Sequence, residues 1–141
     1  MSKFALLVRL ATDRMDAAAE RMRKAQLAHT QAENTLAQIT GYIGDYQQRM
    51  LSLGQSGTSV AQWADYRLFL QKLDDAREQQ TREVDRSLQR FLMEKQAWLQ
   101  QRKQPKSYEV LQEREKARLA LRQRRQEQKA LDEFAARPKP E

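Results

Sequence analysis

The sequence predicts an all-α protein: a long antiparallel two-helix coiled-coil hairpin with an overhanging C-terminal helix. Three observations lead to this fold class. The 141 residues include only 4 glycines, all between positions 41 and 57, and 3 prolines, all beyond position 104. An apolar heptad repeat fills the first long stretch without a breaker, and a glycine turn follows it. A many-stranded sandwich or barrel is excluded, because it needs turn residues at regular spacing.

The first helix is expected over residues 3 to about 53, where the heptad repeat is unbroken. Its seam positions alternate in steps of four and three residues, as they do in a coiled coil. Bulky residues occupy one set of these positions: Val8, Met15, Met22, His29, Leu36, Ile43 and Met50. Alanine occupies four consecutive positions of the other set: Ala11, Ala18, Ala25 and Ala32. Small side chains let two helix backbones approach closely, so the pattern predicts a tightly packed partner helix.

A turn predicted at residues 54–59 allows the chain itself to supply that partner helix. Gly54 and Gly57 stand among small polar residues, a composition typical of turns. Thr58 or Ser59 can cap the helix that follows, because a side-chain oxygen accepts a hydrogen bond from a free amide of the first turn.

The second helix is expected over residues 60 to about 135. Folding the chain at the turn pairs residues whose numbers sum to about 113, so that Met22 meets Phe91 and His29 meets Val84. Pro105 has no amide hydrogen and predicts a kink or a break near residues 103 and 104. The whole chain, residues 1–141, then forms a single hairpin domain.

The end of the second helix has no counterpart on the first helix beyond about residue 109, by the same register. We therefore expect a single charged helix that overhangs the hairpin, followed by a frayed tail over residues 136–141. A lone polar helix is only marginally stable in water, so this segment is expected to become ordered on a partner.

The chain has no catalytic constellation, and we assign it no catalytic residue, no metal and no cofactor. It contains no cysteine, and no glycine precedes the Lys-Ser or Lys-Thr pair of a phosphate-binding loop. His29 stands four residues before Glu33, a spacing that can hold a metal. A seam histidine in an imperfect coiled coil is the better interpretation, because two ligands on one helix seldom make a site. No segment approaches the roughly 20 apolar residues of a membrane span, so we expect a soluble, cytoplasmic protein.

The formal net charge of +7 is concentrated near the C-terminus. Residues 102–141 hold 12 of the 26 basic and 7 of the 19 acidic residues. The densest basic patch consists of Arg114, Lys116, Arg118, Arg122, Arg124, Arg125 and Lys129. Basic helices can bind nucleic acid or anionic membranes, but this patch lacks interleaved aromatic residues and its apolar face is thin. A solvated helix with intrahelical ion pairs stays open as an interpretation, and a protein partner with acidic loops is favoured.

Aromatic residues gather on both sides of the predicted turn. Tyr42 and Tyr46 end the first helix, and Trp63, Tyr66 and Phe69 open the second. A two-stranded seam shelters only about one residue in three or four from each helix, and this group has more apolar bulk than that. It forms either a wide local core or an exposed apolar patch, and such a patch usually marks an interaction site.

The order and spacing of the aromatic residues resemble those of a known protein family. The spacing Ile39-x2-Tyr42-x3-Tyr46, then a glycine turn, then Trp63-x2-Tyr66-x2-Phe69-x3-Leu73 resembles the flagellar export protein FliJ family. The segments Leu111-Gln112-Glu113-Arg114 and Leu131-Asp132-Glu133-Phe134 look like that family's C-terminal helix. The resemblance covers nearly the whole chain. It implies a non-enzymatic antiparallel coiled coil of the flagellar type III export apparatus.

The resemblance also implies partners and a location. Such a stalk inserts into the hexameric ring of the export ATPase and contacts the cytoplasmic part of the membrane-embedded export gate. It is also linked to export chaperones. The implied location is cytoplasmic, peripheral on the cytoplasmic side of the cell membrane, without membrane insertion or nucleic-acid binding. The implied gate-binding cluster is Thr35, Ile39, Tyr42, Tyr46, Phe69, Leu73, Ala76 and Gln80. The basic patch is then the candidate surface for the ATPase ring.

Three alternatives remain at the level of sequence. The first is an equivalent stalk protein of a virulence-type injectisome, which has the same fold. A basic nucleic-acid-binding coiled coil uses the basic patch, and its affinity collapses as salt rises. A generic scaffold pairs as a parallel homodimer instead of folding back on itself.

Overall fold

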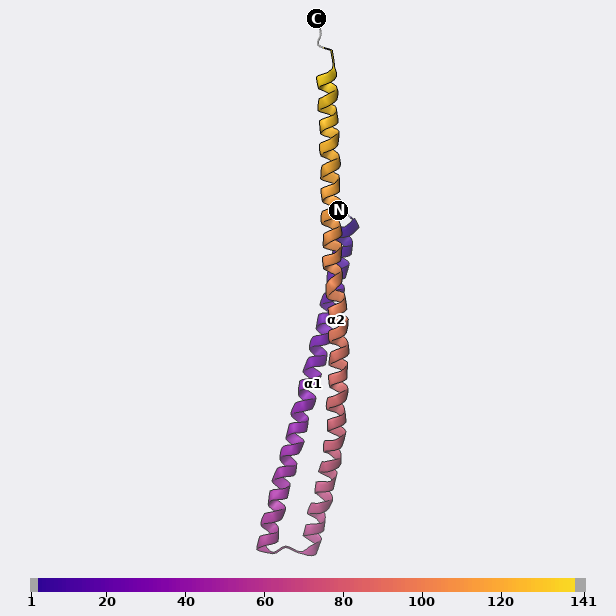
Figure 1. Ribbon diagram of the computed structural model, residues 1–141. Helices are drawn as coiled ribbons and strands as arrows, with labels where there is room; N and C mark the ends of the chain where they lie inside the picture. The colour runs from indigo at the N-terminus through magenta and orange to yellow at the C-terminus, as the bar shows by residue number, and fades with distance from the viewer. Residues whose placement is uncertain (1–2, 139–141) are drawn as a thin grey trace. The chain divides into compact units, whose positions relative to one another are not determined.

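The computed structural model describes residues 3–138 and confirms the all-α fold class. It consists of helix α1, Lys3–Ser56, and helix α2, Val60–Ala136, joined by residues 57–59. The two helices pack antiparallel as a hairpin within one chain (Figure 1). None of the helices in residues 3–138 combines the length and the apolar character needed to cross a lipid bilayer.

The chain divides into two compact units, and each is described by itself. The hairpin unit is Ala17–Trp98 and includes the connection between the helices. The terminal unit combines Met1–Asp16 with Leu99–Glu141.

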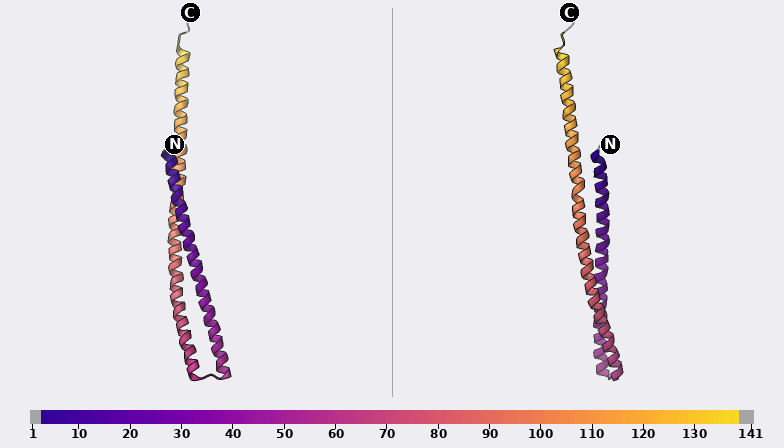
Figure 2. Two further views of the ribbon diagram at one scale, coloured as in Figure 1. Left: turned by 180° about the vertical axis from the view of Figure 1, so that it is seen from behind. Right: turned by 90° about the vertical axis from the view of Figure 1, so that its right-hand side faces the viewer.

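Side-chain contacts between α1 and α2 define the register of the hairpin unit. Arg21 Nε lies 3.3 Å from Glu94 Oε2. His29 Nδ1 lies 3.0 Å from Ser87 Oγ, one helical turn beyond the predicted partner Val84. Figures 1 and 2 show the two helices of this unit running alongside each other to the connection. The antiparallel pairing follows the sequence prediction, with a register offset of up to about one turn.

Alanine forms most of the buried core of the hairpin unit. Ala18 is 0% exposed, Ala25 and Ala32 are 7% exposed, and Ile43 is 3% exposed. Bulky seam residues such as Met22 and Leu36 are only half-buried. A single facing helix covers a short side chain completely, but it covers only part of a long one. The alanine positions therefore mark where the backbones come closest, as the heptad pattern predicts.

The connection contains Gly57 and a serine cap, and Gly54 lies in the last turn of α1. Gly57 adopts a φ of 81°, in the left-handed region that favours glycine. A Cβ on Gly54 would lie 3.6 Å from the Trp63 ring, an ordinary van der Waals distance, so Gly54 lies beside the indole. Ser59 caps α2: its hydroxyl accepts a hydrogen bond from the Gln62 amide at 3.1 Å. The cap therefore satisfies one of the free amides in the first turn of α2.

Pro105 does not interrupt α2, which runs without a break from Val60 to Ala136. The break that its missing amide predicts is therefore not observed. A proline removes one backbone hydrogen bond from the helix, but the other residues of this long helix keep their backbone hydrogen bonds. Pro105 is also buried in the terminal unit, so its ring adds apolar contact there.

The terminal unit brings the first turns of α1 together with α2 from Leu99 onward. Phe4, Val8 and Tyr108 are half-buried, and Ala11 is 3% exposed. Every residue from position 116 to position 138 is exposed. Residues 139–141 of the predicted frayed tail lie outside the described residues.

Candidate functional site

The predicted gate-binding cluster lies entirely in the hairpin unit and forms one stripe on each helix. The stripe on α1 consists of Thr35, Ile39, Tyr42 and Tyr46, and the stripe on α2 consists of Phe69, Leu73, Ala76 and Gln80. Both stripes advance by four, three and four residues. These steps keep side chains on one side of an α-helix.

Contacts at the two ends place the stripes side by side. At the end near the connection, the Tyr46 ring centroid lies 4.6 Å from that of Phe69 and 5.9 Å from that of Tyr66. At the other end, Gln80 Nε2 donates a hydrogen bond to the Ala32 carbonyl at 3.0 Å. The antiparallel register sets the remaining stripe residues of the two helices opposite one another. The structure therefore joins all eight residues into one surface, which we call the apolar face.

The apolar face is partly packed and partly open to solvent. Tyr42 is 56% exposed and Phe69 is 42% exposed, while Ile39 and Leu73 are half-buried. Thr35 is exposed, and its hydroxyl donates to the Gln31 carbonyl at 3.0 Å. Both interpretations of the aromatic group hold in part. Tyr46 belongs to a local ring cluster, and Tyr42 and Phe69 present apolar surface that a partner can cover.

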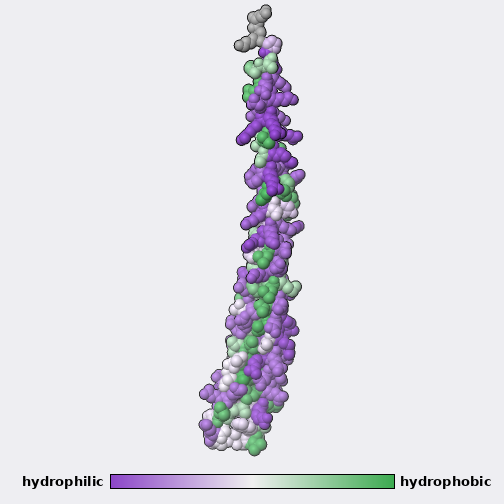
Figure 3. All heavy atoms as spheres, viewed as in Figure 1, coloured by the Kyte–Doolittle hydropathy of each residue, from purple (hydrophilic) through white to green (hydrophobic). Residues whose placement is uncertain are grey.

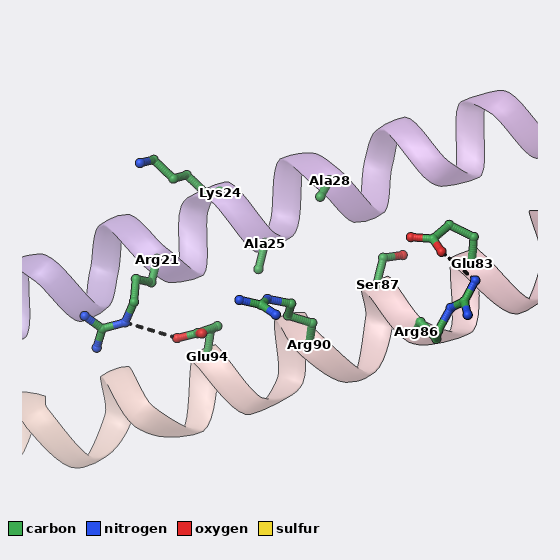
Figure 4. A pocket seen from close by; sticks show the side chains of 9 residues that line it. All are labelled: Arg21, Lys24, Ala25, Ala28, Glu83, Arg86, Ser87, Arg90 and Glu94. Atoms are coloured by element: carbon green, nitrogen blue, oxygen red, sulfur yellow. Dashed lines mark hydrogen bonds and ion pairs between the residues drawn. The ribbon is translucent and has the colours of Figure 1, made fainter.

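A groove of about 440 Å³ opens between α1 and α2 in the hairpin unit and was not predicted from the sequence (Figure 4). Three of its lining residues are small: Ala25 and Ser87, which are buried, and Ala28, which is exposed. Its rim is charged: Arg21, Lys24, Glu83, Arg86, Arg90 and Glu94. One feature of the sequence could have indicated this groove. The alternating steps of four and three residues that define the two stripes of the apolar face continue along both helices into the groove. We call it the alanine-floored groove.

The basic patch lies in the terminal unit, and all seven of its residues are exposed. Five of them share one side of α2, because they are separated by four, four, three and four residues: Arg114, Arg118, Arg122, Arg125 and Lys129. We call this set the basic face. Lys116 and Arg124 point in other directions, and Lys116 Nζ lies 4.0 Å from Glu113 Oε1. Figure 3 shows hydrophilic residues over most of the viewed surface of this part of α2.

His29 is engaged on both ring nitrogens. Nδ1 lies 3.0 Å from Ser87 Oγ, and Nε2 pairs with the Glu33 carboxylate. Within residues 3–138, no group of three or more histidine, aspartate or glutamate side chains is placed to hold a metal ion. His29 thus acts as a polar contact of the helix seam.

One surface ion pair of the hairpin unit has resolved pKa shifts. Arg23 donates to the Glu20 carboxylate at 2.7 and 3.0 Å. This hydrogen bond, helped by the charges of Arg23 and Lys24, lowers the pKa of Glu20. The same hydrogen bond, helped by the charge of Glu20, raises the pKa of Arg23. Both side chains are exposed, and such pairs contribute little to stability. These shifts arise from surface ion pairing.

Comparison with known proteins identifies the family. The family model described as "Flagellar FliJ protein" matches residues 1–138. The flagellar FliJ protein of Salmonella typhi is 28% identical over 128 residues, which cover 91% of this chain and 87% of that protein. The flagellar FliJ protein of Escherichia coli strain K12 is 28% identical over 133 residues, which cover 94% of this chain and 90% of that protein. The chain therefore belongs to the flagellar FliJ family, a non-catalytic component of the flagellar export apparatus.

Proposed function

We propose that this protein is a stalk of the flagellar type III export apparatus that links the export ATPase ring to the export gate. The basic face binds the ATPase hexamer and promotes its assembly, and the apolar face binds the cytoplasmic part of the gate. Export chaperones are further partners. The protein works in the cytoplasm, peripheral on the cytoplasmic side of the cell membrane through these partners.

The apolar face is the observation that carries this proposal. Eight residues from two distant stretches of the chain come together on one surface, with Tyr42 and Phe69 open to solvent. Aromatic side chains of this kind are common binding hot spots, because a partner that covers them removes a large apolar area from water. The local ring contacts hold Tyr46 and Phe69 in place before binding, which lowers the entropy cost of association.

The basic face supports binding to the ATPase ring. Its cations lie on one side of an exposed helix, so they produce a directional positive field. A field of this kind speeds the encounter with an acidic pore and orients docking more than it adds affinity. A helix without tertiary contacts is only weakly stable in water. Binding to the ATPase ring would stabilise the helical segment that carries the basic face.

The test of gate binding is the double variant Phe69→Ala with Leu73→Ala. We expect its affinity for the purified cytoplasmic part of the gate to fall at least about tenfold, because two hot-spot side chains are lost. Helical content and stimulation of the ATPase should stay near wild type. Leu51→Ala is the control, since Leu51 is 67% exposed and lies outside the apolar face.

Two results would contradict the proposal for the apolar face. Unchanged gate affinity in the double variant would exclude these residues from the interface. Loss of helical content would show that the two side chains are core residues. A pull-down from native cytosol tests the proposed binding to the ATPase ring, with the ATPase subunit as the expected capture.

A further inference from the structure

The apolar face and the alanine-floored groove form one continuous surface of the hairpin unit. Beyond the apolar face, the α1 stripe continues through Ala32, Ala28, Ala25 and Arg21, and the α2 stripe continues through Glu83, Ser87, Arg90 and Glu94. The Gln80–Ala32 hydrogen bond joins the stripes where face and groove meet, and the Arg21–Glu94 ion pair closes the far end. At 1.5 Å per residue this surface is roughly 37 Å long, enough for a partner helix of about seven turns.

The groove carries a positive charge that its own carboxylates do not balance. Four basic and two acidic side chains line it. Arg21 pairs with Glu94 at 3.3 Å, and Arg86 pairs with Glu83 at 2.8 Å. Lys24 acts on Glu20, whose pKa it helps to lower. The Arg90 side chain forms no ion pair and no hydrogen bond with any residue within 3–138.

The floor of the groove leaves space beside this unpaired cation. Ala25 and Ser87 are 7% and 8% exposed, and short side chains on both helices leave the groove open above them. Figure 4 shows the Arg90 guanidinium lying between the two helices, below Ala25 in this view. A carboxylate that enters here would form a charge-assisted hydrogen bond, which is stronger than a bond between neutral groups.

We propose that the alanine-floored groove binds an acidic helical segment of the export gate. The same partner helix lays apolar side chains on the apolar face and carboxylates against Arg90 and Lys24. This inference rests on the proposed function of the apolar face and adds the chemistry of its partner: one half of the helix is apolar and the other half is acidic. Charge complementarity in the groove sets the direction in which the partner helix lies.

The matched pair Arg90→Glu and Arg82→Glu tests the groove. Arg82 lies eight residues before Arg90 on the same helix, is exposed, does not line the groove and has no ion pair within residues 3–138. Both substitutions change the charge equally. Titration calorimetry with the purified cytoplasmic part of the gate should show at least about tenfold weaker binding for Arg90→Glu and less than about twofold for Arg82→Glu.

Salt dependence and a neutral variant complete the test. Binding by the wild type should weaken as salt rises, and Arg90→Gln should lose affinity while it flattens this dependence. The Phe69→Ala, Leu73→Ala double variant should lose affinity at every salt concentration. Unfolding followed by circular dichroism checks that each variant is folded, and Arg90→Gln serves as the binding test where Arg90→Glu is unstable.

The outcomes separate this inference from the proposed function. Equal gate affinity of the Arg90 and Arg82 variants, with intact binding by the wild type, would overturn the groove site and leave the apolar face as the gate surface. Absence of gate binding by the wild type would overturn both.

A cross-link identifies the occupant directly. Because the chain contains no cysteine, Ala28→Cys provides a unique attachment point for a photoreactive label in the groove. We expect the label to mark a gate peptide rich in aspartate or glutamate. Labelling of a second copy of this chain, or of a gate segment without carboxylates, would overturn the inference.

Discussion

The hairpin unit and the exposed part of α2 are both helical, but different interactions hold them. In the hairpin unit a facing helix covers the seam, so that Ala18 is 0% exposed and Ile43 is 3% exposed. Beyond position 115 every described residue is exposed, including Leu131 at 63% and Phe134 at 72%. That segment relies on local propensity and on pairs such as Gln128 with Asp132 at 3.0 Å. The comparison teaches that packing between helices stabilises the hairpin unit, whereas the exposed part of α2 is left without such packing.

Amide hydrogen exchange should show the largest difference between the two regions. We expect amides of residues 120–135 to exchange at least about a hundredfold faster than those of residues 20–45, because a helix without tertiary contacts opens locally at low cost. Mass spectrometry of peptides from the free protein measures this ratio. Equal protection would mean that the exposed helix is stabilised by contacts of its own, and the comparison would then fail.

The alanine seam can be broken by one substitution. Ala18→Leu places a large side chain where the backbones are close, and we expect a loss of about 1–3 kcal/mol in the free energy of unfolding. Ala17→Leu is the control, because Ala17 is exposed on the same turn. Urea unfolding followed by circular dichroism compares the two. If both variants unfold at the same urea concentration, close backbone packing is not what stabilises the hairpin.

The basic face predicts which cations of the exposed helix matter. Arg122→Glu with Arg125→Glu should lower stimulation of the ATPase about fivefold, because both residues belong to the basic face. Lys116→Glu with Arg124→Glu changes the net charge equally on other sides of the helix and should have a smaller effect. Gate binding should be spared in both. Equal losses in ATPase stimulation would indicate a response to net charge alone and would remove the distinction between the sides.

The Glu20–Arg23 pair predicts the smallest effect. Its hydrogen bond lowers the pKa of Glu20 in the folded state. The stability that the pair adds is therefore present above the ordinary pKa of glutamate and is lost as the pH falls through the lower, folded-state value. Arg23→Ala should remove this small dependence while leaving neutral-pH stability almost unchanged, since the pair is exposed. Urea midpoints measured between neutral and acidic pH test this, and a large loss at neutral pH would contradict it.

Much of the fold followed from local periodicity in the sequence. The heptad steps from Val8 to Met50 required a partner helix, and the glycines near residue 57 allowed the chain to provide it. Antiparallel pairing of the helices was predicted correctly. Of the kink or break predicted at Pro105, the break was wrong, because α2 continues through this residue. The propensity of one residue takes no account of the helical hydrogen bonds around it.

The candidate sites were predictable to different degrees. The residues of the apolar face came from a family resemblance. The structure brings them together: two stripes that are 23 positions apart at their nearest become one surface at Tyr46 and Phe69. The alanine-floored groove was not predicted, because alanines on a seam signal only close packing. Its unpaired Arg90 becomes apparent only when the opposite helix is in place.

The sequence by itself determined that the chain forms two long helices that fold back on each other, since periodicity, breakers and caps act over a few residues. Only the tertiary structure decided which sides of the helices adjoin. That depends on the rotation of each helix about its axis and on their register, which are set by contacts between residues far apart in the chain. These contacts place Tyr42 and Phe69 in solvent, bring Arg90 over the groove, and leave the basic face uncovered.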